Sequence, residues 1–219
     1  MRVRPQPGTA FTLVELLTVV AILGLLVTIL MPGLTRARLL ARITKAKGEL
    51  ANISTALSIY HQANRAYPPA RTYCEYGDTL KAPDWAELPP ELAGQGYLPT
   101  PPPGTTMTVD AEDPFNPERT YKYLACGRGY HNGAGTWIGI WVADDFPRGD
   151  PEKGKEYWSP DDSPVRYVLW SVGTFGDIGY WASLARHHPF NTDQWFPGKD
   201  DKGLVVRACM KDGQFVMSR

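Results

Sequence analysis

Glu15 is the residue whose position most needs a chemical explanation, because it lies near the start of a long apolar run. That run, FTLVELLTVVAILGLLVTILM, covers residues 11–31 and holds no other charged side chain. An ionised carboxylate in the hydrocarbon core of a membrane costs at least about 2.5 kcal/mol and is tolerated mainly where it finds a partner. The position of Glu15 therefore predicts a cationic partner near the beginning of the run.

Proteolysis could create that partner from the chain itself. A cut between Ala10 and Phe11 would place the new amine of Phe11 one helical turn from Glu15, in the same chain or in a neighbouring copy. A carboxylate near a helix N-terminus is also favoured by the helix dipole. We therefore interpret Glu15 as one half of an ion pair that processing completes.

The apolar run is long enough to cross a membrane. A helix rises about 1.5 Å per residue, so these 21 residues span a hydrocarbon core of roughly 30 Å. A cleaved secretory signal has an apolar region of only about 7–15 residues, followed by a small-x-small cleavage site. Here Met31, Pro32 and Gly33 lead instead into basic sequence. A plain signal anchor remains an alternative, but it gives Glu15 no function.

The segment from Arg2 to Pro32 resembles the N-terminus of type IV pilins and pseudopilins, with a short basic leader, a cleavage site and the mature start FTLVELLTVVAILGLL. The resemblance implies a prepilin leader at residues 1–10, cleavage between Ala10 and Phe11, N-methylation of Phe11, and Glu15 as the carboxylate used in filament assembly. Pro32 falls where many members carry a proline that kinks the helix. Family members usually have glycine before the cut, so Ala10 predicts slower processing.

The resemblance also sets the orientation in the membrane. Counted alone, the basic residues would place the C-terminal side in the cytoplasm. More of them follow the run than precede it: Arg36, Arg38, Arg42, Lys45 and Lys47 against Arg2 and Arg4. The resemblance implies the opposite, with the leader inside and the head outside the cytoplasmic (inner) membrane, because the prepilin peptidase cuts on the cytoplasmic face.

The same resemblance names the expected partners. These are other copies and other pilins in a periplasmic or cell-surface filament, the prepilin peptidase, the assembly machinery of the inner membrane, and membrane lipid before assembly. Nucleic acid is not an expected partner, because residues 68–219 hold 15 basic and 21 acidic side chains and offer no cationic excess.

A helix is predicted to continue well beyond the membrane. Apolar residues recur at helical spacing and would pack one face on a domain: Leu39, Leu40, Ile43, Leu50, Ile53, Leu57 and Tyr60. Pro68 and Pro69 end the pattern, which predicts a helix from Phe11 to about Ala66. It comprises a transmembrane and assembly part at 11–32 and an amphipathic part at 33–67. A helix folded back as a hairpin is the alternative.

The remaining residues, 68–219, predict a loop-rich β head. Residues 68–119 are rich in Pro and Gly and predict loops with a short helix around 85–92, with disorder as the alternative at 98–105. Aromatic and β-branched residues predict strands at 119–126, 136–143, 165–173 and 203–210, and a tight turn is predicted at 211–214. The predicted class is α+β and pilin-like, a long helix packed on a small antiparallel sheet.

Two motifs in the head resemble the major pseudopilin of type II secretion systems. They are DPFNPERTYKY at 113–123 and YVLWSVG at 167–173. In that family the loop after the second motif binds calcium through carboxylates and carbonyls, the ligands that calcium prefers. Phe175 occupies the family's aspartate position, so the candidate ligands are Asp177 with Asp200 or Asp201. The alternative is a solvated acidic loop.

The other residue types with reactive side chains predict no enzyme. Cys74, Cys126 and Cys209 suggest one disulfide, of open pairing, and one free thiol outside the cytoplasm. The chain lacks C-x-x-C and G-x-S-x-G motifs, and the pair His187-His188 has no further ligand at helical spacing, so neither a zinc site nor a nucleophilic active site is predicted. No cofactor is expected apart from the calcium candidate.

Two functions remain open. The first is a structural subunit of a type IV pilus-like or type II secretion pseudopilus filament. The second is a membrane-tethered extracytoplasmic binding protein with an acidic, Trp-rich head, although the seven tryptophans suit a hydrophobic core better than a ligand platform. Glu15 favours the first, because a simple anchor gains nothing from a charge within its span.

Overall fold

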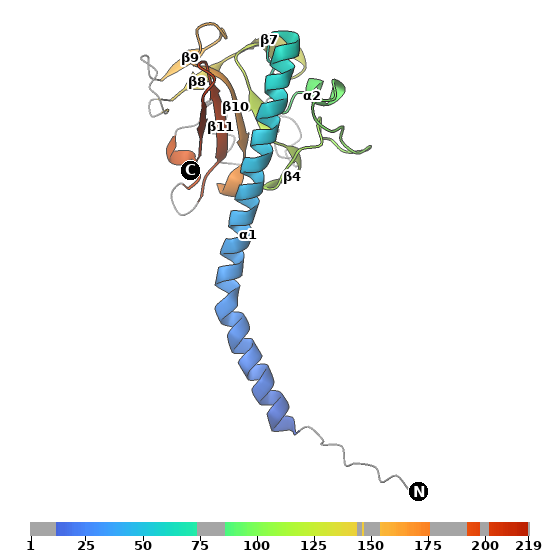
Figure 1. Ribbon diagram of the computed structural model, residues 1–219, viewed down its shortest axis with the longest axis vertical. Helices are drawn as coiled ribbons and strands as arrows, with labels where there is room; N and C mark the ends of the chain where they lie inside the picture. The colour runs from blue at the N-terminus through green and yellow to red at the C-terminus, as the bar shows by residue number, and fades with distance from the viewer. Residues whose placement is uncertain are drawn as a thin grey trace. The chain divides into compact units, whose positions relative to one another are not determined.

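A computed structural model of the chain describes residues 12–73, 86–143, 146, 154–175, 192–197 and 202–218. It divides into two compact units, Met1–Ala41 and Arg42–Arg219. The helix α1, Leu13–Asn64, contributes its first part to one unit and the remainder to the other (Figure 1). The predicted long helix is therefore confirmed.

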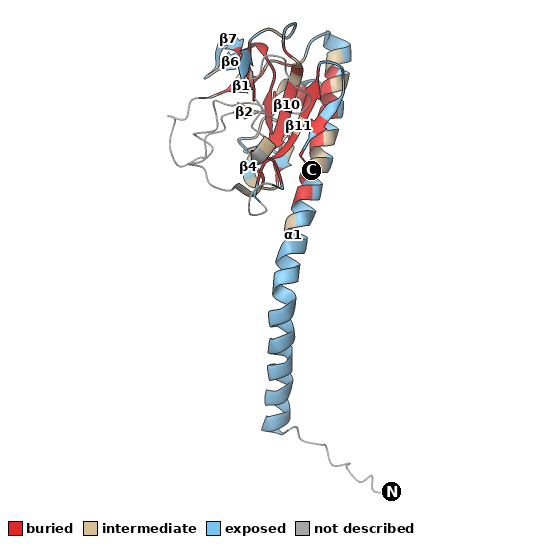
Figure 2. Ribbon diagram, turned by 90° about the vertical axis from the view of Figure 1, so that its left-hand side faces the viewer, coloured by how far each residue is buried: buried red, intermediate tan, exposed pale blue. Residues whose placement is uncertain are grey.

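The first unit presents an apolar helical surface. Figure 2 shows the N-terminal part of α1 as exposed throughout. By length and composition, α1 is the one helix among the described residues that could cross a membrane. Pro32 lies within α1 rather than ending it. Whether it kinks the helix, as the resemblance implies, stays a prediction.

In the second unit, α1 buries one face. The buried positions advance by three or four residues, as a helix of 3.6 residues per turn requires: Ile43, Ala46, Leu50, Ile53, Leu57 and Tyr60. The predicted stripe is thus largely confirmed. Leu40 was wrongly included, since it is 48% exposed. It lies one residue, about 100°, away from this series.

The helix ends where the sequence predicts. Asn64 is its last residue, and Arg65 follows with a left-handed φ of 59° while its amide donates to the His61 carbonyl at 2.8 Å. This is a helix C-cap in the left-handed conformation. Pro68 and Pro69 come soon afterwards and prevent any continuation.

The described residues of the head form two four-stranded sheets and two two-stranded ones. The strand order is β2-β1-β6-β7 in the first sheet and β12-β11-β10-β5 in the second, while β3 pairs with β4 and β8 with β9. The strands are β1 Arg71–Thr72, β2 Ala86–Glu87, β3 Glu112–Asp113, β4 Asn116–Thr120, β5 Lys122–Leu124, β6 Gly127–His131, β7 Ala134–Ile138, β8 Ile140–Val142, β9 Lys155–Tyr157, β10 Val165–Ser171, β11 Val205–Met210 and β12 Phe215–Met217.

All pairings between the described strands are antiparallel except one. β1 pairs in parallel with β6, with Arg71 opposite Tyr130. A parallel pair needs a long connection, and the chain between β1 and β6 supplies one. The predicted α+β class, a long helix with small antiparallel sheets, is confirmed, and the parallel β1–β6 pair is an addition that the sequence analysis did not predict.

The second sheet packs against α1 through its central strands (Figures 1 and 2). Residues of β10 are buried almost without alternation, which is typical of a strand covered on both faces. Arg207 of β11 donates from Nε to Ser54 Oγ on α1 at 2.9 Å. The hydroxyl of Tyr121 donates to the Glu49 carboxylate. These contacts fix the sheet to the buried face of the helix.

The turn between β11 and β12 confirms the prediction at 211–214. Gly213 has a φ of 82°, and the Met210 amide donates to the Gln214 carbonyl at 2.8 Å. The Gln214 amide also donates to Asp212 Oδ1 at 2.9 Å. Glycine suits this position because it adopts a positive φ without steric cost.

The alternative of disorder at residues 98–105 is wrong, and the predicted short helix is only partly correct. The helix α2 is a single turn, Glu91–Gly94, whereas Ala86 and Glu87 form β2 because they pair with β1. The predicted short helix is thus wrong for these two residues, and Trp85 lies outside the described residues. At 98–105 the structure has an ordered loop, held by Leu98 N to Leu92 O at 2.9 Å and Asp110 N to Pro99 O at 3.0 Å.

The described tryptophans divide between core and surface, whereas the two described cysteines are both buried. Trp170 and Trp195 are buried, whereas Trp137 and Trp158 are each 50% exposed. Cys126 and Cys209 are buried free thiols, so the predicted disulfide does not join these two residues. Cys74 lies outside the described residues.

Candidate functional site

Glu15 and Thr12 form a reciprocal pair of hydrogen bonds at the start of α1. The Thr12 amide and hydroxyl both donate to Glu15 Oε2, at 2.9 and 2.7 Å. In return the Glu15 amide donates to Thr12 Oγ1 at 3.2 Å. This is the capping box that S/T-x-x-E sequences form at helix N-termini.

The capping box gives Glu15 a local structural role that the sequence analysis missed. Its signal was readable, because residues 12–15 spell TLVE. The box satisfies amide groups that the first turn of a helix leaves without partners, and it places the carboxylate at the positive end of the helix dipole. The predicted cleavage site, Ala10 and Phe11, lies outside the described residues. Pairing between Glu15 and the Phe11 amine therefore stays a prediction.

The apolar surface that follows Glu15 is extensive. Fifteen large apolar side chains between Leu13 and Leu34 are each 47–79% exposed. None of the described parts of the chain covers them. Such a surface is unfavourable in water, because apolar side chains gain free energy when they are removed from water.

The polar side chains within this surface satisfy their own hydrogen bonds. The hydroxyls of Thr18, Thr28 and Thr35 donate to backbone carbonyls three or four residues earlier, at 2.9, 2.8 and 2.9 Å. Bonds of this kind allow Ser and Thr side chains to lie in apolar surroundings. Only Glu15 therefore brings a full charge to the helix between Thr12 and Thr35.

In the head, the two motifs that resemble the major pseudopilin meet in space. Asp113, the first residue of DPFNP, accepts a hydrogen bond from Ser171 Oγ at 2.6 Å and one from the Val172 amide at 2.9 Å. Asp113 also accepts from the Phe115 amide at 2.9 Å, which closes its own turn. The carboxylate thus joins the turn between β3 and β4 to the end of β10.

The Asp113 carboxylate is fully buried, so its ionised form loses the free energy of hydration. Burial raises the pKa of Asp113, whereas the bonds from Ser171, Phe115 and Val172 and the nearby Lys122 oppose that rise. A buried carboxylate is retained mainly where it is fully hydrogen-bonded. We therefore assign Asp113 to holding the backbone at Val172 in place.

Two glycines bring together the backbones on either side of residues 174–202. Gly173 has a φ of 57°, and Gly203 has a φ of 152°. The Thr174 amide donates to the Gly203 carbonyl at 3.1 Å, and the Gly203 amide donates to Thr174 Oγ1 at 3.0 Å. A Cβ on Gly173 would lie 2.0 Å from the Gly203 carbonyl oxygen, so only glycine fits there.

The calcium candidates fall between these two glycines in the sequence. Asp177, Asp200 and Asp201 all lie outside the described residues. The part of the chain that is described contains no group of three or more His, Cys, Asp or Glu residues arranged to hold a metal. Calcium binding stays a prediction.

Comparison with known proteins identifies a relative. The chain is 35% identical to the type II secretion system core protein G of Pseudomonas aeruginosa over 127 residues, which cover 58% of this chain and 79% of that protein. No protein-family model matches the chain. No solved structure matches it either.

Proposed function

The chain belongs to the family of the type II secretion system core protein G, a pseudopilin, and on that premise we propose that it is a structural, non-enzymatic subunit of a pseudopilus filament. The observation that carries the proposal is the uncovered apolar surface of α1 that begins at the Thr12–Glu15 capping box.

The apolar surface requires a covering partner. Burying one large aliphatic side chain contributes about 1.5–3 kcal/mol. Burying the fifteen exposed ones would therefore contribute tens of kcal/mol. Membrane lipid would cover them before assembly. The same helices of neighbouring copies and of other pilins would cover them within a filament, because an apolar helix that suits lipid also packs in a bundle.

Glu15 then supplies specificity to the packing. Contacts between apolar helices alone favour no single register. A buried charge fixes the register, because it is stable only opposite its counter-charge. We propose that the chain is cleaved between Ala10 and Phe11 and that Phe11 is N-methylated. Its amine then pairs with Glu15 of the same or a neighbouring copy. The capping box supports this role, because it holds the carboxylate at a fixed position on the helix end.

The proposed route places the leader on the cytoplasmic side of the inner membrane and the head outside. Prepilin peptidase would remove the leader there. The assembly machinery of the inner membrane would then extract the subunit into the filament. The core of the head, fixed to α1 by Tyr121–Glu49 and Arg207–Ser54 contacts, would remain folded during this transfer.

The decisive experiment is intact mass measurement and N-terminal sequencing of the protein recovered from cells, together with electron microscopy of sheared filaments. We expect a chain that begins at N-methylated Phe11 and filaments that contain it. A chain that retains its leader and never enters a filament would instead favour the tethered binding protein.

A further inference from the structure

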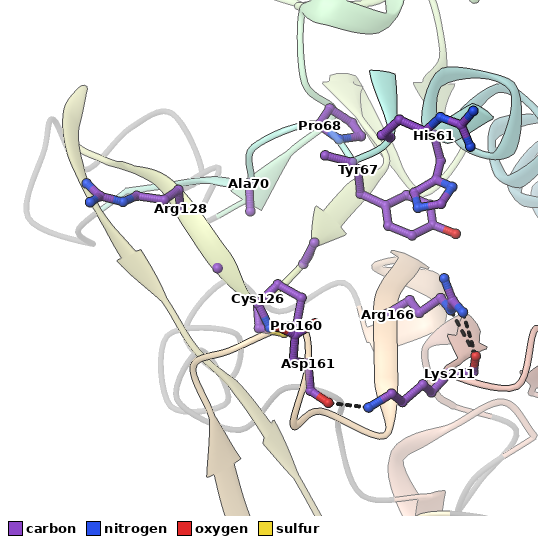
Figure 3. A pocket seen from close by; sticks show the side chains of 14 residues that line it. His61, Tyr67, Pro68, Ala70, Cys126, Arg128, Pro160, Asp161, Arg166 and Lys211 are labelled. Carbon is purple, nitrogen blue, oxygen red and sulfur yellow. Dashed lines mark hydrogen bonds between the residues drawn. The ribbon is translucent and has the colours of Figure 1, made fainter. Parts of the chain in front are cut away.

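The head contains a pocket of about 450 Å³ beside the C-terminal end of α1 (Figure 3). Its walls come from α1 and the residues that follow it, from the start of β6, and from residues around β10 and the turn after β11. We call it the cationic pocket after four of its lining residues: Arg65, Arg128, Arg166 and Lys211.

The charge of this pocket differs from that of the head as a whole. Asp161 is the single carboxylate among the described residues that line the pocket, against four cationic side chains. Arg128 extends away from Arg166 and Lys211 (Figure 3), with its guanidinium carbon 5.3 Å from the centroid of the Trp137 ring. Arg65, Arg166 and Lys211 therefore supply the excess of positive charge. Over residues 68–219, by contrast, acidic side chains outnumber basic ones by 21 to 15. Clustering of one sign of charge in a concave site raises the local concentration of the opposite charge.

Two of the cations are held side by side by neutral groups. Arg166 donates from Nε and Nη2 to the Lys211 carbonyl, at 3.0 and 2.7 Å. Lys211 Nζ in turn donates to the backbone carbonyl of Asp161. Figure 3 shows both contacts at one end of the pocket. These bonds orient the cations without neutralising them, so an anion bound here would meet two positioned charges.

Aromatic and apolar side chains form a further part of the wall, beside the charged residues. His61 stacks on Tyr67 with ring centroids 4.5 Å apart and an angle of 28°. Tyr67 in turn packs against the buried Tyr167 at 5.0 Å. Pro68 and Pro160 add apolar surface, and the ring of each proline fixes its own backbone φ angle. A ligand that suits these walls carries an apolar body beside its anionic group.

We propose that the cationic pocket binds a peptide through a carboxylate that lies next to an apolar side chain. The volume lies within the range of about 300–1,000 Å³ that is typical of ligand sites and exceeds what one small inorganic anion fills. Arginine and lysine form charge-assisted hydrogen bonds with carboxylates, which are about twice as strong as neutral ones. This binding goes beyond the proposed function, because filament packing through α1 requires no ligand in the head.

The carboxylate can come from a peptide C-terminus or from an acidic side chain, and calorimetry distinguishes the two. The full-length protein in a non-ionic detergent is titrated with acetyl-Gly-Ala-Leu, with its C-terminal amide, and with acetyl-Gly-Asp-Leu amide. Inorganic phosphate is the fourth probe. We expect saturable binding of at least one carboxylate peptide, at least about tenfold weaker binding of the uncharged amide, and weakening by added salt.

Three variants test whether the pocket is responsible. Lys211→Gln and Arg166→Gln are expected to weaken binding of the carboxylate peptide by at least about tenfold. Lys202→Gln, which removes an exposed cation outside the pocket lining, is the matched control and is expected to bind normally. Circular dichroism of each variant verifies folding. If Arg166→Gln fails to fold, the Lys211→Gln variant alone decides the test, because Lys211 is exposed and its replacement leaves the core unchanged.

Several results would overturn the proposal. Equal binding of acid and amide peptides would show that no carboxylate is recognised. Equal weakening by Lys202→Gln would show unspecific attraction. Saturable binding of phosphate without either carboxylate peptide would assign the pocket to small inorganic anions, and absence of heat with all four probes would leave it without a ligand.

Discussion

Thr12 and Glu15 hold each other in place at the start of α1, since the threonine hydroxyl donates to the carboxylate at 2.7 Å and accepts from the glutamate amide at 3.2 Å. Glu15 therefore has two separable properties. Its side-chain oxygen caps the helix, which a neutral glutamine can also do. Its negative charge is available for an ion pair, which a glutamine cannot form.

Glu15→Gln separates these two properties. The variant keeps the capping box and is expected to insert and be processed normally, because it only removes a charge from an apolar span. Assembly is expected to fail, since the Phe11 amine then remains unpaired in a bundle of low dielectric constant. Loss of one partner from a buried pair costs about 3–5 kcal/mol. Immunoblots for processed protein and electron microscopy of sheared filaments measure the two steps.

Thr12→Ala is the matched control. It removes the cap hydroxyl but keeps the charge, so the first turn of the helix loses about 0.5–2 kcal/mol of stability while filaments still form. Glu15→Asp, one methylene shorter, is expected to be partly tolerated. Normal filaments from Glu15→Gln combined with none from Thr12→Ala would show that Glu15 acts only as a cap. The ion-pair mechanism would then be wrong.

The processing site gives a second prediction. The mature chain is expected to start at N-methylated Phe11, and Ala10→Gly is expected to speed cleavage, because the family usually carries glycine before the cut. Pulse-chase labelling followed by immunoblotting measures the rate, and mass spectrometry identifies the N-terminus. Recovery of mature protein that retains residues 1–10 would contradict the pseudopilin route.

Asp113 gives a third prediction, about stability. Its two carboxylate oxygens accept from Ser171, Phe115 and Val172 in a buried site. Asp113→Asn replaces one acceptor oxygen by a donor, which leaves a buried hydrogen bond unmade and costs about 1–3 kcal/mol. Ser171→Ala removes one donor only and is expected to cost less. Urea unfolding of the two variants measures the difference, and an equal or smaller loss in Asp113→Asn would refute the assigned role.

The pH dependence of the same residue has a definite sign. Burial raises the pKa of Asp113, so the folded chain binds this proton more tightly than the unfolded chain does. Stability from Asp113 is therefore greatest below the ordinary carboxyl pKa and falls as pH rises towards the raised value. Unfolding measured across this window is expected to show that slope in the parent chain, and Asp113→Asn is expected to reduce it. An unchanged slope in the variant would show that Asp113 titrates normally.

Sequence reasoning succeeded where a local pattern decides the structure. The stripe from Ile43 to Tyr60 follows from helical periodicity, and the end of α1 follows from Pro68 and Pro69. The strands at β10 and β11 follow from their β-branched and aromatic residues. The Thr12–Glu15 capping box is equally local, because the TLVE sequence at 12–15 fits the S/T-x-x-E pattern.

The features that escaped prediction depend on residues far apart in the chain. The parallel pairing of β1 with β6 and the Asp113–Ser171 bond, which spans 58 residues, arise only when the sheets assemble. The cationic pocket draws its charges from four separate segments, so no stretch of sequence contains its pattern. Composition even pointed the other way, because the head as a whole carries more acidic than basic residues.

The last prediction concerns Gly173 and uses Gly213 as its control. Both glycines have positive φ, 57° and 82°, so alanine at either position pays the cost of a left-handed conformation, about 1–2 kcal/mol. At Gly213 a Cβ would have nothing within 4 Å, whereas at Gly173 it would lie 2.0 Å from the Gly203 carbonyl oxygen. Gly173→Ala is therefore expected to lower the free energy of unfolding by clearly more than Gly213→Ala. The excess measures how much stability depends on the close approach of the Gly173 and Gly203 backbones. Urea unfolding of both variants measures it, and equal losses would show that this approach is not required for stability.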